Sequence, residues 1–71
     1  MDARLYTYLI IRRNGEYLVG RTLWGRNELR WSISPYDAWR TRDREKAARV
    51  ARKTGGITML FNPVSGQLRV L

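Results

Sequence analysis

Tyrosine and arginine side chains recur among apolar residues in the first part of this sequence, and their chemistry suits contact with a nucleic acid. Tyrosine rings stack on unpaired bases, and the planar guanidinium group forms paired hydrogen bonds with phosphate. The chain carries 14 Lys and Arg against six Asp and Glu, a formal net charge of +8. This balance predicts DNA or RNA as a partner, and the alternative is that the cations only keep a small domain soluble.

Residue types that commonly support catalysis or bind metals are missing. The sequence has no histidine and no cysteine, which removes the commonest general base, the commonest metal ligands and any disulfide. Its carboxylates are scattered, and its glycines do not have the spacing of a phosphate-binding loop. We therefore expect a non-enzymatic binding module with no cofactor and no metal.

The pattern of residue types predicts a β-hairpin near the amino terminus. Residues 4–13 and 16–23 are rich in β-branched and aromatic types, and Asn14-Gly15 between them favours a two-residue type I′ turn. Residues 29–34 alternate apolar and polar side chains (Leu29, Trp31, Ile33), which predicts a third, half-buried strand.

The second half of the chain predicts a helix followed by another hairpin. Residues 34–37 favour one short helical turn, with serine at the N-cap and proline at the first helical position. The main helix is expected to begin with Thr41 as N-cap and to end at Gly55-Gly56. It has a stripe of small side chains at helical spacing, namely Ala47, Val50, Ala51 and Thr54.

Two further strands are expected at 57–61 and 67–71, joined by a proline- and glycine-containing turn at 62–66. The fold class is thus α+β. We expect one domain, residues 1–71, with an antiparallel sheet of about five strands in the order β-β-β-α-β-β and one helix packed on one face. The position of the C-terminal hairpin, beside the first strand or beside the third, stays open.

A two-residue turn would set the hairpin register and therefore the two faces of the sheet. It places Arg13 opposite Glu16 and Ile11 opposite Leu18. The face expected to lie under the helix then carries Leu5, Thr7, Leu9, Ile11, Leu18, Gly20 and Thr22. The other face, which a single helix would leave open, carries Tyr6, Tyr8, Ile10, Arg12, Tyr17, Val19, Arg21 and Leu23.

The expected open face is the first candidate site. Its rings and cations would bind single-stranded nucleic acid, with Tyr8 and Tyr17 on bases and Arg12 and Arg21 on phosphates. The helix would add a second, basic contact through Arg42, Lys46, Arg49 and Lys53. One alternative is a homodimer or protein partner on the same face, through Tyr6, Ile10, Val19 and Leu23. Another is that Tyr and Arg merely decorate an exposed sheet.

The three tryptophans are expected to pack more than to bind. Trp31 shares the apolar positions of the third expected strand with Leu29 and Ile33 and is assigned to the core. Trp39 is expected to pack at the start of the helix. Trp24, at a strand end, is the best candidate of the three for an exposed ring.

Residues 5–53 resemble the amino-terminal arm-binding domain of tyrosine integrases. The resemblance rests on three strands followed by a helix that opens with Trp39-Arg40-Thr41-Arg42, with Glu45 and Ala47 beyond. It implies a sheet inserted in the DNA major groove, with Arg12, Arg21 and Arg30 near bases or phosphates. The extra hairpin at 57–71 departs from that pattern.

Most of the chain is also similar to small orphan proteins of bacterial phages and prophages. The shared features are Trp31-Ser32, Asp37-Ala38-Trp39, Thr41, Lys46-Ala47, Gly55-Gly56 and Phe61-Asn62-Pro63. This similarity implies an accessory protein of a mobile element, with no established activity. The longest apolar run, Leu9-Ile10-Ile11, is too short for a membrane span or a signal peptide, so we expect no membrane association and a cytoplasmic location.

Overall fold

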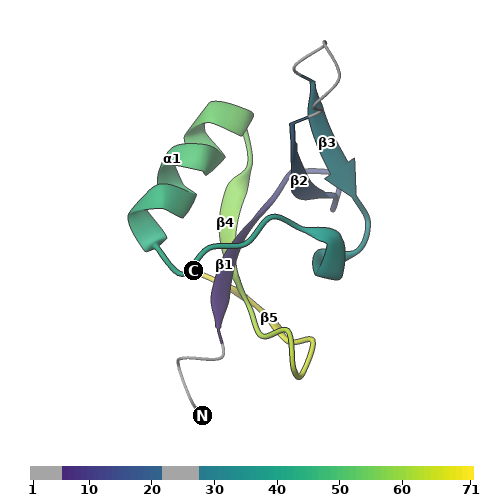
Figure 1. Cartoon of the computed structure of the whole chain (residues 1–71), viewed down its shortest axis with the longest axis vertical. Helices are drawn as coiled ribbons and strands as arrows, with labels where there is room; N and C mark the ends of the chain where they lie inside the picture. Colours follow the sequence, from purple (N-terminus) through teal and green to yellow (C-terminus); the bar gives the residue numbers. More distant parts are fainter. Residues whose placement is uncertain (1–5, 22–27) are drawn as a thin grey trace.

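The computed structural model describes residues 6–21 and 28–71, and of Arg21 only the backbone (Figure 1). In these residues the chain forms an antiparallel five-stranded sheet and one α-helix, which confirms the predicted α+β class and element order. The strands and helices are β1 (Thr7–Ile11), β2 (Tyr17–Arg21), β3 (Leu29–Ser32), the 3-10 turn η2 (Pro35–Asp37), α1 (Arg44–Thr54), β4 (Ile57–Phe61) and β5 (Leu68–Val70). No helix in this part of the chain is long and apolar enough to cross a membrane.

The C-terminal hairpin extends the sheet beside β1. The strand order is β3-β2-β1-β4-β5, and β1 pairs with β4 along its whole length, from Thr7 opposite Phe61 to Ile11 opposite Ile57. This pairing makes β1 the central strand. It resolves the alternative that the sequence left open.

The turn of the first hairpin differs from the prediction. Gly15 N–H donates to the Arg12 carbonyl (2.9 Å) and Arg12 N–H to the Glu16 carbonyl (2.9 Å), so the loop has three residues, Arg13 to Gly15. Gly15 takes the left-handed conformation, with φ of 86°. A loop of this kind needs that conformation at its last residue, whereas a type I′ turn needs positive φ at both central residues. It also makes Arg12 and Glu16 cross-strand neighbours, and their side chains form an ion pair.

The three-residue loop shifts the register by one residue, so the expected pairing is wrong. Ile11 pairs with Tyr17 and not with Leu18. β1 and β2 then separate, and the segment Trp39–Thr41 lies between them. Trp39 N–H donates to the Leu18 carbonyl (2.8 Å), and Thr41 exchanges two backbone hydrogen bonds with Tyr8 (2.7 and 3.0 Å).

The shifted register reverses the expected faces of β1 relative to the helix, whereas Leu18 of β2 lies under the helix as expected. Side chains predicted to be open lie under α1: Ile10 is fully buried against Ala47 and Ala51, and Tyr8 packs at the edge of the same cluster. Leu18 and Trp31, which share a cross-strand pair, also belong to this cluster. The stripe of small side chains on the helix packs as expected, since Ala47 and Ala51 are buried and Val50 and Thr54 are half-buried.

The face opposite α1 is covered as well, so a lone helix does not leave an open sheet here. Leu9, Tyr17 and Phe61 pack there against Ala38, which follows η2. The Tyr36 ring meets the Phe61 ring edge-on, with centroids 5.3 Å apart. In Figure 1, α1 lies on one side of β1 and β4, and η2 lies on the other.

The predicted turn at residues 34–37 is confirmed, and it explains why β3 ends early. The Ser34 hydroxyl accepts a hydrogen bond from Tyr36 N–H (3.3 Å), with Pro35 at the first helical position. Ser32 ends the strand because its hydroxyl donates to Asp37 (3.2 Å) and accepts from Ser34 N–H (3.1 Å). Ile33, expected inside the strand, lies beyond it and is 85% exposed.

The helix begins two residues later than predicted. Asp43 is the N-cap, and its Oδ1 accepts from Glu45 N–H (3.0 Å) and Lys46 N–H (3.2 Å). Thr41 instead pairs with β1, and its hydroxyl accepts from Asp43 N–H (3.1 Å). The helix ends at Gly55, in the left-handed conformation as expected.

The turn at 62–66 is held by a side chain that the sequence did not single out. Asn62 is buried, and its Oδ1 accepts from Val64 N–H (2.9 Å) and Ser65 N–H (3.3 Å). Gly66 takes the left-handed position, as predicted.

Candidate functional site

The two tyrosines of the predicted stacking surface lie on opposite faces of the sheet. Tyr17 is 8% exposed and packs against Leu9 and Phe61, whereas Tyr8 packs under α1. The predicted Tyr8–Tyr17 platform on one open face is therefore wrong. The physical reason is the one-residue register shift, which moves every side chain of β2 to the other face relative to β1.

The sheet arginines are separated as well. Arg12 hydrogen-bonds to Glu16 through Nε (3.0 Å), and its guanidinium lies 4.4 Å from the Trp31 ring centroid, on the α1 side of the sheet. Arg30 is exposed and, because it alternates with Trp31, points to the other side. For Arg21 the structure describes only the backbone. Trp24 lies outside the described residues.

Glu16 holds Arg12 in place and is itself affected by it. The hydrogen bond from the Arg12 guanidinium, helped by one from the Asn14 amide (2.6 Å), keeps the pKa of Glu16 below its usual value. Arg12 is thus occupied by an internal carboxylate. It is a poorer candidate for phosphate than a cation without such a partner.

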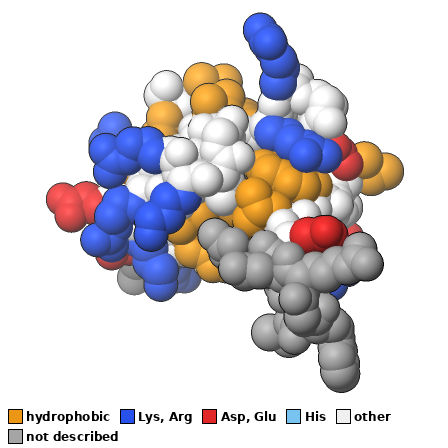
Figure 2. All heavy atoms as spheres, turned by 90° about the horizontal axis from the view of Figure 1, so that it is seen from above, with side chains coloured by type: hydrophobic (Ala, Val, Ile, Leu, Met, Phe, Trp, Pro, Cys, Tyr) orange, Lys and Arg blue, Asp and Glu red, His pale blue; other side chains and the backbone are white. Residues whose placement is uncertain are grey.

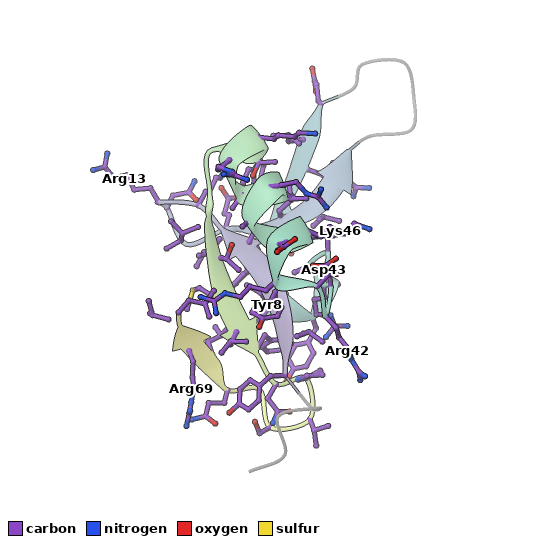
Figure 3. All side chains as sticks on the ribbon, turned by 90° about the vertical axis from the view of Figure 1, so that its left-hand side faces the viewer. Tyr8, Arg13, Arg42, Asp43, Lys46 and Arg69 are labelled. Atoms are coloured by element: carbon purple, nitrogen blue, oxygen red, sulfur yellow. The ribbon has the colours of Figure 1, made fainter. Side chains whose placement is uncertain are left out.

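The basic residues of the helix are brought together on one exposed surface. Lys46, Arg49 and Lys53 follow one another at i, i+3 and i+7, and this cationic stripe runs along α1. Arg42 lies just before the helix, and Figure 3 shows it projecting on the same side as Lys46, away from Arg13 and Arg69. Figure 2 shows Lys and Arg side chains gathered on the side of the molecule where α1 lies.

Few acidic groups oppose these cations. Residues 42–53 contain six Lys and Arg against Asp43 and Glu45, a balance of +4. Asp43 is engaged in capping the helix. Within residues 6–21 and 28–71, no cation of this segment makes an ion pair, and all six side chains are exposed. The segment is therefore available for an external anion.

An apolar groove lies beside the stripe, between α1 and the strands β2 and β3. Its volume is about 320 Å³, and its lining residues are Leu18, Gly20, Leu29, Trp39, Lys46, Val50, Lys53 and Thr54. Lys46 and Lys53 belong both to the groove and to the cationic stripe. Figure 2 shows apolar surface directly next to the basic side chains. The surface as a whole combines positive charge with an apolar depression.

The groove results from two local features of the fold. β2 has a bulge between Leu18 and Gly20, where the register with β3 shifts, and Gly20 adopts a φ of 147°. Among the described residues, no atom lies within 4 Å of the position that a side chain at Gly20 would take. Trp39 packs at the start of the helix, as predicted, and also lines the groove.

The sequence identified the basic residues at the helix but not the groove. Their spacing within one short segment of the chain is enough to recognise Arg42, Lys46, Arg49 and Lys53. The groove depends on how α1 sits against β2 and β3. The one available signal was Gly20 inside a strand pattern, which is typical of a bulge.

Groups for acid–base or metal chemistry do not come together in this surface. In the described part of the chain, no three acidic, histidine or cysteine residues are close enough to hold a metal ion. No buried side-chain polar atom there lacks a hydrogen-bond partner. The arrangement is suited to binding an anion next to an apolar group. Comparisons with protein-family models, curated proteins and solved structures found no match.

Proposed function

We propose that this protein is a nucleic-acid-binding module that uses the exposed basic surface of α1. The observation that carries the proposal is the set of six exposed cations in residues 42–53, none of them in an ion pair with a described residue. Phosphate contacts supply most of the affinity of such interfaces, and the backbone of a folded helix needs no further ordering when these contacts form. The sheet does not supply the stacking surface expected from the sequence, so the helix replaces it as the main contact.

The test is binding of labelled DNA and RNA, measured by fluorescence anisotropy over a range of salt concentrations. We expect affinity to fall steeply with salt, with a log–log slope of about 0.7 per phosphate contact for single strands. Lys46→Glu with Lys53→Glu should abolish binding at moderate salt.

A matched control is Arg13→Glu with Arg30→Glu, at two exposed arginines outside the stripe. Each exchange removes two units of charge, so both double variants fall from +8 to +4. We expect the control to keep most of the affinity. Equal losses in both variants would show that net charge alone drives binding, and absence of binding at low salt would refute the proposal.

A second candidate function, self-association or contact with another protein, is favoured by a different observation. On the face opposite α1, Ile57 is 60% exposed and Val70 is 77% exposed. Met59 connects them, because it follows Ile57 by two residues on β4 and pairs with Val70 on β5. Exposed apolar side chains beside an edge strand favour protein contacts. Sedimentation of wild type and Ile57→Lys tests this second function. A wild-type oligomer that is absent in the variant would support it, and a wild-type monomer at high concentration would exclude self-association.

A further inference from the structure

The groove beside the cationic stripe has the composition of a site for one unpaired base. Leu18, Leu29, Trp39 and Val50 provide apolar and aromatic surface, and Lys46 and Lys53 provide charge. Its volume of about 320 Å³ falls in the range of small-molecule pockets. A purely phosphate-binding surface needs no such depression, because phosphate contacts are made by cations and hydrogen-bond donors at the protein surface.

We propose that this groove receives an unpaired nucleobase from a single-stranded nucleic acid, whose phosphates lie against Lys46 and Lys53. This inference rests on the proposed function and adds the class of nucleic acid. Bases of a single strand can leave the stack and lie on an aromatic side chain, and Trp39 is an aromatic residue that lines the groove. Bases inside a duplex are stacked and paired, so they do not enter.

The spacing of the two lysines agrees with this arrangement. Lys53 lies seven positions after Lys46, which corresponds to about 10 Å along the helix axis. The two ammonium groups can therefore bind phosphates on either side of a nucleotide, and Val50 lies between them in sequence and lines the groove. Charge and apolar surface are arranged along one path, as in single-strand binding channels.

Two hydrogen bonds help to fix the walls of the groove. Trp39 is tied to β2 through the Leu18 carbonyl (2.8 Å), and the Thr54 hydroxyl donates to the Val50 carbonyl (2.8 Å). The missing side chain at Gly20 leaves space at one end. A groove held in this way loses little entropy when a base binds.

The experiment compares three probes of equal length: single-stranded oligo-dT, the same strand paired with oligo-dA, and an abasic strand with the same sugars and phosphates. Val50→Phe fills the groove and leaves both lysines in place. Its matched control is Ala48→Phe, because Ala48 is exposed on the helix and does not line the groove. Circular dichroism checks that both variants are folded.

We expect wild type to bind oligo-dT more tightly than the duplex and at least five-fold more tightly than the abasic strand, the lower end of what one stacked base contributes. Val50→Phe should remove that advantage and leave abasic binding unchanged, and Ala48→Phe should have no effect. If Val50→Phe does not fold, the indole N–H signal of Trp39, assigned with Trp39→Phe, decides the question. It should shift with oligo-dT and not with the abasic strand.

Failure of this inference is distinguishable from failure of the proposed function. Equal affinity for oligo-dT and the abasic strand, with binding still lost in Lys46→Glu with Lys53→Glu, would overturn the base site and leave phosphate binding by α1 intact. Absence of binding to all three probes at low salt would overturn both. Tighter binding of the duplex would overturn the base site alone.

Discussion

The two faces of the sheet are covered by different kinds of structure. On one face an eleven-residue helix packs its alanines on Ile10 and turns its cations to solvent. On the other face a short segment around η2 closes over Leu9, Tyr17 and Phe61 with Ala38 and the Tyr36 ring, which meets Phe61 edge-on. Both coverings bury a core, and the helix also presents the cationic stripe with an apolar groove beside it. Both faces therefore contribute to stability, and the proposed nucleic-acid contact lies on the helix side alone.

The largest expected effect tests whether the η2 face is a true core. Phe61→Ala should destabilise the protein by about 3–5 kcal/mol, because Phe61 is fully buried and its loss leaves a cavity. Val64→Ala, at a residue 77% exposed in the adjacent turn, should change stability by less than about 0.5 kcal/mol. Chemical denaturation measures both. A small effect of Phe61→Ala would mean that this face is open, as the sequence predicted.

The next effect tests how closely α1 lies on the sheet. Ala47→Leu should destabilise by about 1–3 kcal/mol, since Ala47 is fully buried against Ile10 and a larger side chain has no room. Ala48→Leu makes the same change one residue later on the exposed side. Thermal unfolding of the pair should separate them clearly. If both variants keep wild-type stability, the helix does not pack on this face as described.

A smaller effect tests where the helix begins. Asp43→Ala should cost about 0.5–2 kcal/mol, because the N-cap carboxylate accepts hydrogen bonds from two backbone N–H groups. Thr41→Ala should cost less, since its hydroxyl accepts one such bond, from Asp43. Helicity and melting temperature measure the difference. The reverse order of effects would place the N-cap at Thr41.

The smallest effect concerns the hairpin turn and its dependence on pH. The pKa of Glu16 is lowered mainly by the hydrogen bond from Arg12, so ionised Glu16 stabilises the folded state above the ordinary glutamate pKa. That stabilisation is lost as pH falls through the lowered value. Melting temperatures of wild type and Glu16→Gln should differ slightly at neutral pH and converge in acid. A constant difference at all pH values would contradict this role.

Local sequence signals predicted much of the fold. Residue type and spacing predicted the strands, the turn at Ser34-Pro35 and the end of the helix at glycine. They also predicted the small buried side chains Ala47 and Ala51. The cationic stripe could be predicted in the same way, because helical spacing alone places Lys46, Arg49 and Lys53 on one surface.

The register of the first hairpin could not be predicted from the same signals. Asn14-Gly15 suits a two-residue turn, but Gly15 also suits the end of a three-residue loop, and the bonds among Arg12, Asn14 and Glu16 favour the latter. The one-residue shift in register placed Tyr17 on the same face as Leu9 and not on that of Tyr8. The covering of the second face and the groove depend on contacts between distant segments, such as Trp39 with Leu18, which have no local pattern.

Nucleic-acid binding is proposed for the α1 side of this protein and not for the η2 side. The most direct test is a titration of the isotopically labelled protein with oligo-dT, followed by amide chemical shifts. We predict progressive shifts at Lys46, Arg49 and Lys53 and at Trp39 beside them, with Phe61 and Val70 unchanged. Shifts confined to the opposite face, or no shifts at low salt, would contradict the account.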